Sequence, residues 1–280
     1  MDPVEYFRNH LTPRHPVPTD TAPALRHFEG IKAVIFDIYG TMLVSGAGDI
    51  GVDASNARML GAMKETLESF GSTVPPENAL AEYFDLIDEL HRKSDHEYPE
   101  IEIRTVWTAL LERHGLSPDL ASEACVIFEC AANPVWPMPE LEESLSAIKS
   151  SGKRLGIISN AQFYTPLLFP ALFGKELPEL GFDREAVIYS YQVGEGKPSR
   201  NLYQSMKEIL NTKSISPAET LYIGNDMLKD IYPARAEGFN TVLFAGDQRS
   251  LRWHHGDDRL IGISPDAIIT ELNQIQQLIS

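Results

Sequence analysis

Seven polar residues of this sequence follow apolar runs, at the places where strands of an α/β sheet would end. The set holds a carboxylate, a hydroxyl, an ammonium group and an acidic cluster. In an open α/β sheet, ligands bind outside the carboxyl ends of the strands, so residues at those ends converge on one crevice. The residues are Asp37, Ser159, Asn160, Lys197, Asn225, Asp226 and Asp230.

Each of these residues has a simpler interpretation when it is taken alone. A Ser-Asn pair after a strand is often a helix cap, and an isolated lysine is usually solvated. Lys197, however, lies among Gly194, Gly196 and Pro198, which fix its backbone. Because all of the residues occur in the order of successive strand ends, the pattern favours a catalytic site.

Asp37 is suited to act as a nucleophile. It ends an apolar run and is followed by a turn at Gly40. Its carboxylate can attack phosphorus or carbon, which gives an acyl phosphate or an ester that water then opens. Ser159 can hold an oxygen of the transferring group through its hydroxyl and its backbone N–H. Lys197 supplies a positive charge that neutralises both Asp37 and an anionic substrate.

The elements around these residues are predicted from apolar patterning. A near-continuous apolar run from Ile31 ends on Asp37, which is typical of a strand buried on both faces of a parallel sheet. Helical stretches separate the later runs, which predicts crossover connections and an α/β fold with a doubly wound parallel sheet. The other predicted strands are Arg154–Ser159, Ala186–Tyr191, Thr220–Gly224, Asn240–Phe244 and Asp266–Ile269.

Residues 48–135 show a different pattern, with helical periodicity and no buried strand. We expect them to form a helical cap inserted into a core of residues 28–47 and 136–280, and to open and close over the crevice. Residues 1–27 contain five prolines and are expected to form an extended arm over the body. The predicted cap helices are Asn56–Phe70, Pro76–Ser94, Ile103–His114 and Ser117–Ala132.

The motifs at the predicted strand ends resemble those of the haloacid dehalogenase-like hydrolase superfamily, which often places a helical cap after the first strand. The resemblance covers about residues 28–275 and leaves the N-terminal arm unmatched. It implies a Rossmann-like core and hydrolysis with Asp37 as the nucleophile. The matching segments are Phe36-Asp37-Ile-Tyr-Gly-Thr-Met, Ile158-Ser159-Asn160, Gly196-Lys197-Pro198 and Gly224-Asn-Asp-Met-Leu-Lys-Asp230.

Tyr39 departs from the pattern of the phosphatases in this superfamily. They usually have a second aspartate at this position, which protonates the leaving oxygen and then activates water. Loss of a general acid or base typically costs about 10²–10⁴-fold in rate, and a phenol is a poor base at pH 7. The Asp-x-Tyr-Gly-Thr form instead resembles the 2-haloacid dehalogenases, in which carbon is attacked, halide leaves without a proton and no metal is used.

Asn225 is a second departure, because most metal-dependent members have aspartate there. Asp226 follows at once, and Asp230 lies four residues further on. Without a metal these carboxylates and Asp37 would repel one another, and a divalent cation relieves that repulsion. We therefore expect Mg²⁺ to bind Asp37, the carbonyl of Tyr39, Asn225 and Asp226, with Asp230 behind them. The alternative is that Asp230 only caps the following helix.

Selectivity is expected to come from the insertion. The segment His91–Arg104 crowds charges and aromatic residues into a predicted loop between helices. Arg104 or Arg92 can clamp a substrate carboxylate or phosphate, although a solvated run of charges explains the same pattern. With Arg104, the predicted substrate contacts are Tyr39 and Asn160.

Composition excludes several classes of function. The chain has 280 residues with 24 basic and 40 acidic side chains, a net charge of −16, which argues against nucleic acid as a partner. Cys125 and Cys130 lie on different faces of a predicted helix, so we expect two buried thiols and a reducing compartment. No apolar run approaches the about 18 residues that span a bilayer, and we expect a cytoplasmic protein without a membrane partner.

Taken together, the residues predict a Mg²⁺-dependent hydrolase of a small anionic substrate, a phosphate ester. A metal-independent 2-haloacid dehalogenase is the first alternative, favoured by Tyr39. The second is a catalytically weakened protein that binds a phosphorylated ligand or a protein partner, because Tyr39 and Asn225 each replace a carboxylate. The sequence gives no indication of an oligomeric state.

Overall fold

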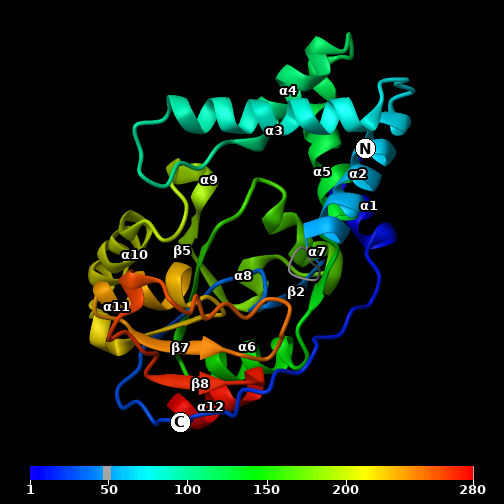
Figure 1. Ribbon diagram of the computed structural model, residues 1–280. Coiled ribbons are helices and arrows are strands. Elements are labelled where there is room, and N and C mark those ends of the chain that lie inside the picture. The colour runs from blue at the N-terminus through cyan, green and yellow to red at the C-terminus, as the bar shows by residue number, and fades with distance from the viewer. Residues whose placement is uncertain (47–51, 280) are drawn as a thin grey trace.

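A six-stranded parallel sheet forms the centre of the molecule, in the order β5-β4-β1-β6-β7-β8 (Figure 1). The computed structural model describes residues 1–46 and 52–279. Every neighbouring pair of strands in this sheet is parallel, which confirms the predicted doubly wound sheet. The strands are β1 (Ala33–Phe36), β4 (Arg154–Ser159), β5 (Phe182–Tyr189), β6 (Thr220–Gly224), β7 (Asn240–Phe244) and β8 (Ala267–Ile269).

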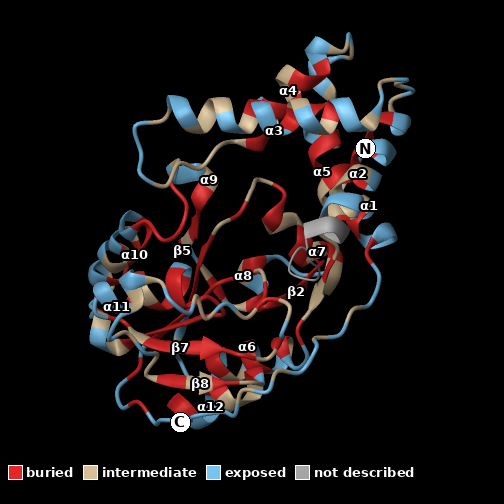
Figure 2. Cartoon of the chain, viewed as in Figure 1, coloured by how far each residue is buried: buried red, intermediate tan, exposed pale blue. Residues whose placement is uncertain are grey.

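The central strand β1 is buried on both faces, as its apolar run predicts. Val34 and Phe36 pack in one hydrophobic cluster and Ile35 in another, because successive side chains of a strand point to opposite faces. All four residues of β1 are 0% exposed, and Figure 2 shows the strands as buried. The position of Asp37, directly after β1, is therefore fixed by the core of the sheet.

Helices cover both faces of the sheet. On the face of Ile35 lie α10 (Arg200–Thr212) and α11 (Tyr232–Ala236), which follows a π-helical turn at Met227–Ile231. The helices that pack on the face of Phe36 are α6 (Leu141–Ser150), α7 (Leu168–Phe173), α8 (Leu177–Leu180) and α12 (Ile275–Ile279). A short helix, α9 (Ser190–Val193), leads from β5 toward Lys197.

The insertion after β1 is helical, as its periodicity predicts. Tyr83, Trp107 and Phe128, from three different helices, pack ring against ring inside it. The expected boundary between core and cap, at residues 47 and 48, lies outside the described residues. The helices are α2 (Val52–Ser69), α3 (Pro76–Lys93), α4 (Ile103–Arg113) and α5 (Ala121–Ala132). No described helix is long and apolar enough to cross a membrane.

Two short strands that the sequence patterns did not predict lie at the base of the insertion. β2 (Leu43–Ser45) pairs antiparallel with β3 (Val135–Pro137), which joins the start and the end of the insertion. Strands of three residues carry too little alternation to be recognised in a sequence.

The prediction of an extended arm is wrong for the first residues. Pro3–His10 form helix α1, which begins at Asp2, whose side chain accepts hydrogen bonds from the backbone N–H groups of Val4 and Glu5. Proline is tolerated in the first turn of a helix, where its missing N–H has no partner to lose. The arm beyond α1 does lie over the body, where Ala24 pairs with Ile268 of β8.

Candidate active site

Six of the seven polar residues predicted at the strand ends line one cavity of about 280 Å³, and the seventh, Ser159, is hydrogen-bonded to Asp37 behind it. Asp37 follows β1, Asn160 follows β4, and Asn225 follows β6. Because all strands of the sheet are parallel, their carboxyl ends share one edge, and the topology brings these residues together. The cavity is lined by Asp37, Tyr39, Ser45, Asn160, Lys197, Asn225, Asp226, Lys229, Asp230, Ser250 and Arg252.

Lys197 lies between two carboxylates at the bottom of this site. Its Nζ is 2.6 Å from Asp37 Oδ1 and 2.5 Å from Asp230 Oδ1. All three residues are buried. Burial favours the neutral form of Lys197, but the charges of Asp230 and Asp37 outweigh it and raise its pKa, so the ammonium stays protonated. The single positive charge of Lys197 is thus shared by the carboxylates of Asp37 and Asp230.

Asp230 is held from several sides. Its Oδ1 also accepts a hydrogen bond of 3.0 Å from the hydroxyl of Tyr222, and its Oδ2 accepts one of 3.0 Å from the backbone N–H of Asp226. A Cβ at Gly224 would lie 2.4 Å from the carboxyl carbon of Asp230, so only glycine fits at the end of β6. Burial raises the pKa of Asp230 to about 6, although the charge of Lys197 opposes this. Asp230 therefore anchors Lys197 rather than capping the following helix.

Ser159 and Asn160, at the end of β4, form hydrogen bonds with Asp37 and with the backbone of Lys197. The Ser159 hydroxyl donates to Asp37 Oδ1 at 3.0 Å, and Asn160 Oδ1 accepts a hydrogen bond of 2.7 Å from the backbone N–H of Lys197. Asn160 thereby fixes the loop that carries the lysine. Among the described residues, both hydrogen bonds to the Asp37 carboxylate end on Oδ1, which leaves Oδ2 for a substrate or a cation.

The hydroxyl of Tyr39 is hydrogen-bonded to a core residue and is therefore not free to exchange a proton with a substrate. Its hydroxyl lies 2.9 Å from Thr165 Oγ1. Burial, and then the nearby charge of Glu129, raise the pKa of Tyr39 well above its ordinary value. The phenol is therefore neutral at pH 7 and is both a weaker acid and a poorer base than an aspartate at this position would be.

The oxygen atoms around the cavity fit a magnesium site only in part. Asp226 Oδ1 is occupied, because it accepts hydrogen bonds of 2.8 Å from the N–H groups of Leu228 and Lys229 and lies 2.9 Å from Nε2 of His254, which leaves only Oδ2 of Asp226 for a cation. The described residues contain no group of three or more His, Cys, Asp or Glu side chains that could hold a metal.

The remaining donors suit a cation that keeps most of its water. Asp37 Oδ2, the carbonyl of Tyr39 and the amide oxygen of Asn225 belong to residues that line one cavity, and Mg²⁺ often binds through one carboxylate and several waters. The Asn225 amide oxygen already accepts a hydrogen bond of 2.9 Å from the hydroxyl of Thr41, which orients it.

The charge argument for a metal is weaker than the sequence suggested. Three carboxylates line the cavity, but three cationic side chains line it as well, so the carboxylates do not need a divalent ion for balance. The sequence singled out only Lys197 among the cations. Lys229 lies inside the Gly224–Asp230 motif and was visible there, whereas Arg252 carries no motif.

The structure does not place Arg104 or Arg92 on the cavity. The guanidinium of Arg104 is bonded to Glu102, with Nε 2.6 Å from Oε2, and lies over the ring of Phe163, 4.4 Å from its centroid. Arg92 is exposed near the end of α3. The expected clamp for a substrate anion is thus absent from this segment.

The insertion contacts the loop that carries Lys197 through its backbone. The N–H of Gly196 donates to the carbonyl of Tyr98 at 2.9 Å, and the N–H of Glu100 donates to the carbonyl of Gly194 at 3.0 Å. The loop between α3 and α4 therefore supports the segment directly before Lys197.

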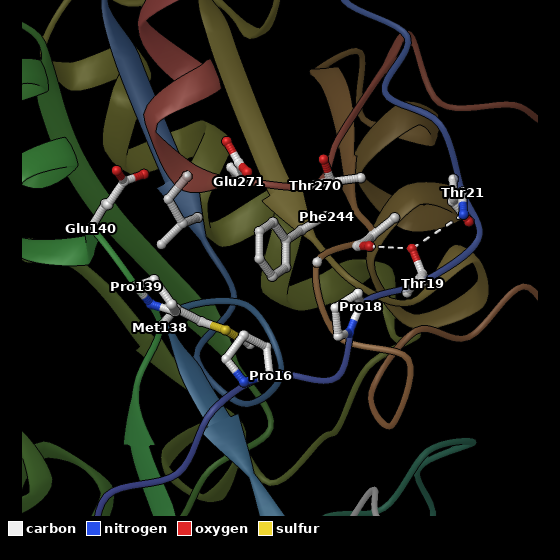
Figure 3. Close-up of a pocket in the computed structure, with 13 residues that line it drawn as sticks. Pro16, Pro18, Thr19, Thr21, Met138, Pro139, Glu140, Phe244, Thr270 and Glu271 are labelled. Atoms are coloured by element: carbon white, nitrogen blue, oxygen red, sulfur yellow. Dashed lines mark hydrogen bonds between the residues drawn. The ribbon is translucent and has the colours of Figure 1, made fainter.

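A larger cavity, of about 480 Å³, lies under the N-terminal arm (Figure 3). Pro16 and Pro18 of the arm face Met138 and Phe244 across it, and the hydroxyl of Thr19 donates to the carbonyl of Ala245 at 2.7 Å. Among the described residues, its lining contains no cationic side chain, no cysteine and no serine. By contrast, the cavity at Asp37 brings a carboxylate into contact with a cation.

Comparisons with known proteins show what the chain as a whole is similar to. The family model described as haloacid dehalogenase-like hydrolase matches residues 31–238. A glyceraldehyde 3-phosphate phosphatase from Methanothermobacter thermautotrophicus is 23% identical over 145 residues, which are 51% of this chain. The match spans 58% of the length of that relative.

Two solved structures are similar over most of the chain. A 2-haloacid dehalogenase from Pseudomonas syringae has a TM-score of 0.60 and 21% identity, covering 88% of this chain and 97% of its own. A phosphatase from Thermococcus onnurineus has a TM-score of 0.53 and 19% identity, with the same coverage of both chains. At these identities the two structures share the fold, and they include both kinds of chemistry.

Proposed function

The chain belongs to the haloacid dehalogenase-like hydrolase family, and we propose that it hydrolyses a small phosphate ester through a covalent intermediate on Asp37. The contact between Asp37 and Lys197, at 2.6 Å, carries this proposal. It joins a nucleophile to a buried positive charge at the strand ends, in a cavity that two further cations line. Such a site attracts an anion and stabilises the charge of its transition state.

In the proposed reaction, Asp37 Oδ2 attacks phosphorus and forms an acyl phosphate while the bond from phosphorus to the leaving oxygen breaks. The leaving oxygen takes its proton from water, because Tyr39 is bonded to Thr165 and is a weak acid. Water then attacks phosphorus and breaks its bond to Asp37 Oδ2, which releases phosphate and restores the carboxylate; the proton that the attacking water loses neutralises the hydroxide left by the first step. Throughout, the Lys197 ammonium and the Ser159 hydroxyl hold Oδ1 of Asp37 in place.

A magnesium ion forms part of this proposal. Asp37, the carbonyl of Tyr39 and Asn225 would hold it, with Asp226 beside them and Asp230 behind. When bound, the ion neutralises negative charge on the phosphoryl oxygens. The residues themselves supply the nucleophile, its orientation and the fixed positive charge of Lys197.

We also propose that the helical insertion acts as a cap over a core of residues 28–47 and 136–280. The contacts of Tyr98 and Glu100 with Gly196 and Gly194 support this arrangement, because they connect the insertion to the loop of Lys197. Closure of such a cap would exclude bulk water from the site while the substrate is bound.

The test is turnover of a panel of phosphate monoesters with Mg²⁺ by the wild type and by Asp37→Asn. The amide is nearly the same size as the carboxylate but cannot form the acyl phosphate, so we expect the variant to lose all measurable turnover. Circular dichroism and thermal unfolding should show that the variant is folded. Retained activity in folded Asp37→Asn would show that Asp37 is not the nucleophile.

A specific observation favours a second candidate, hydrolysis of 2-haloacids. The hydroxyl of Tyr39 is hydrogen-bonded to Thr165 and does not donate a proton to a leaving group, and halide needs no proton when it leaves. In addition, the three cations on the cavity balance the three carboxylates without a metal. Treatment with EDTA distinguishes the two reactions. Phosphoryl transfer should fall when the chelator is present and recover with added Mg²⁺, whereas dehalogenation should be unchanged.

A further inference from the structure

The two side chains that bond to Asp37 stand on different loops. Ser159 is the last residue of β4, and its loop continues with Asn160, whereas Lys197 lies in the loop that follows α9. The side chain of Asn160 accepts a hydrogen bond of 2.7 Å from the backbone N–H of Lys197. The relative position of these two loops therefore decides whether Ser159 and Lys197 both reach Asp37.

One carboxylate of the insertion bonds to both loops. Glu100 lies between α3 and α4 and is half-buried. Its Oε2 accepts a hydrogen bond of 2.8 Å from the hydroxyl of Ser190, the first residue of α9. Its Oε1 accepts one of 3.2 Å from Nε2 of Gln162, two residues after Asn160. The side chain of Glu100 thus joins the loop that follows β4 to the segment that leads to Lys197.

Ser190 connects Glu100 to the residue directly after Asn160. Ser190 is 0% exposed, and its Oγ accepts a hydrogen bond of 2.9 Å from the backbone N–H of Ala161. The single hydroxyl proton of Ser190 can go to Glu100 Oε2 at 2.8 Å or to the carbonyl of Ala161 at 3.3 Å. A carboxylate is the stronger acceptor and is also the nearer one here. Glu100 therefore orients the hydroxyl of Ser190 so that its oxygen faces the N–H of Ala161.

Gln162 is held by the same segment of the insertion. Its Nε2 also donates to the carbonyl of Ile101 at 2.8 Å, and its Oε1 accepts a hydrogen bond of 3.0 Å from the N–H of Ile103. On the core side, the N–H of Gln162 donates to Thr165 Oγ1 at 3.2 Å. The loop after β4 is therefore bonded to the insertion through a side chain whose own backbone is fixed in the core.

The contacts of Glu100 differ from those of the neighbouring carboxylate Glu102. Glu102 bonds to Arg104 of its own segment. In the part of the chain that the structure describes, Glu100 takes part in no ion pair, and its carboxylate accepts from Ser190, Gln162 and the N–H of Ile101. A half-buried carboxylate without a paired cation costs free energy unless hydrogen bonds compensate for it. Two of the three donors that do so belong to the core.

We propose that Glu100 is a positioning residue for the reaction at Asp37, and that it acts by tying the loop after β4 to the loop of Lys197. Glu100 does not line the cavity, so it acts only through Ser190 and Gln162. Because Glu100 belongs to the insertion, the two loops reach this arrangement when the insertion is docked on the core. The inference rests on the proposed function for the reaction itself, but it holds equally for attack on phosphorus and on carbon.

The first test measures the two loops directly, by hydrogen exchange and mass spectrometry of Glu100→Ala. We expect the segments 160–165 and 190–197 to exchange about tenfold faster than in the wild type, because each lost hydrogen bond favours local opening. Strand β7 should exchange at the wild-type rate. The control is Glu97→Ala, which makes the same change at an exposed position of the same segment, where the carboxylate bonds to Tyr98. Wild-type exchange in both loops of Glu100→Ala would overturn the proposal.

The second test separates kcat from KM on a phosphate monoester or haloacid that the wild type turns over. Glu100→Ala should lower kcat by about tenfold, since small displacements of reacting groups are costly, with KM within threefold because the cavity lining is complete. Glu100→Gln keeps an oxygen that accepts from Gln162, so we expect it to restore kcat to within threefold of the wild type. A kcat within twofold of the wild type in Glu100→Ala, or a loss confined to KM, would show that Glu100 does not position the reacting groups.

The two tests distinguish failure of this inference from failure of the proposed function. Hydrogen exchange needs no substrate, so if the wild type turns over neither class of compound, the proposed reaction fails and the exchange of Glu100→Ala still decides whether Glu100 ties the loops together. Turnover by the wild type, with wild-type exchange and kcat in Glu100→Ala, would overturn the role of Glu100 alone. Thermal unfolding of Glu100→Ala and Glu100→Gln should show that both variants are folded.

Discussion

The bottom and the rim of the Asp37 cavity are built in opposite ways. At the bottom, Lys197 is buried and contacts Asp37 and Asp230. At the rim, Lys229 and Arg252 are exposed, and no described carboxylate pairs with them. A buried charge must be paired to be tolerated, whereas an exposed one is stabilised by water and can exchange that water for a ligand. The charges at the bottom are thus fixed by their mutual contacts, whereas those at the rim remain open to solvent.

The largest effect is expected when the lysine at the bottom is removed. Lys197→Met leaves Asp37 and Asp230 buried without their shared positive charge. We expect kcat to fall by about 10²–10³-fold, and the free energy of unfolding in urea to fall by about 3–5 kcal/mol. Lys153→Met, at a half-buried position before β4 and away from the cavity lining, is the control for loss of a charge. An unchanged rate in Lys197→Met would mean that the bottom of the cavity is structural only.

Substitutions of Tyr39 test which of the two candidate reactions takes place at Asp37. If the substrate is a phosphate ester, Tyr39→Asp restores a proton donor and should raise kcat by about tenfold or more. If the substrate is a haloacid, the same change adds a carboxylate near Asp37 without a metal ion to offset its charge, and the rate should fall. Tyr39→Phe, which removes only the hydroxyl bonded to Thr165, is the control. Rates that do not change in Tyr39→Asp would show that this side chain only packs between core and insertion.

The pH dependence of stability tests the buried carboxylate Asp230 at the bottom of the cavity. Burial raises the pKa of Asp230 to about 6, above its value in the unfolded chain, so the folded state binds the proton more tightly. The stabilising contribution of Asp230 is therefore complete below about pH 4 and is lost as the pH rises through 6. Relative to Asp230→Asn, the wild type should become less stable over this range in urea titrations. A stability difference between the wild type and Asp230→Asn that stays constant over this pH range would contradict the raised pKa of Asp230.

The smallest effect is expected for Arg104, the residue that the sequence nominated for recognition. Its guanidinium is bonded to Glu102 and stacks on Phe163, away from the cavity lining. Arg104→Gln should leave KM and kcat within twofold of the wild type for every substrate. A large effect of Arg104→Gln would place substrate recognition in the insertion.

The parts of the fold that local patterns encode were predictable from the sequence. The apolar run that ends on Asp37, and those before Ser159 and Asn225, are strands buried on both faces, and such runs are recognisable without any tertiary information. The helices of the insertion follow from their periodicity. The missed helix α1 also had a local signal, since Asp2 precedes Pro3 in the pattern of a helix start, but the density of prolines after it favoured an extended chain.

The pairings inside the site were decided by the tertiary structure. Strand ends predict that Asp37, Lys197 and Asp230 approach one another, but only packing makes Lys197 bridge the two carboxylates and directs Asp226 to cap the next turn. Ser250 and Arg252 reach the cavity because their backbone bonds to Asn225, some 25 residues earlier. Sequence patterns describe short segments, whereas the charge balance of a site is a sum over segments that only the fold brings together.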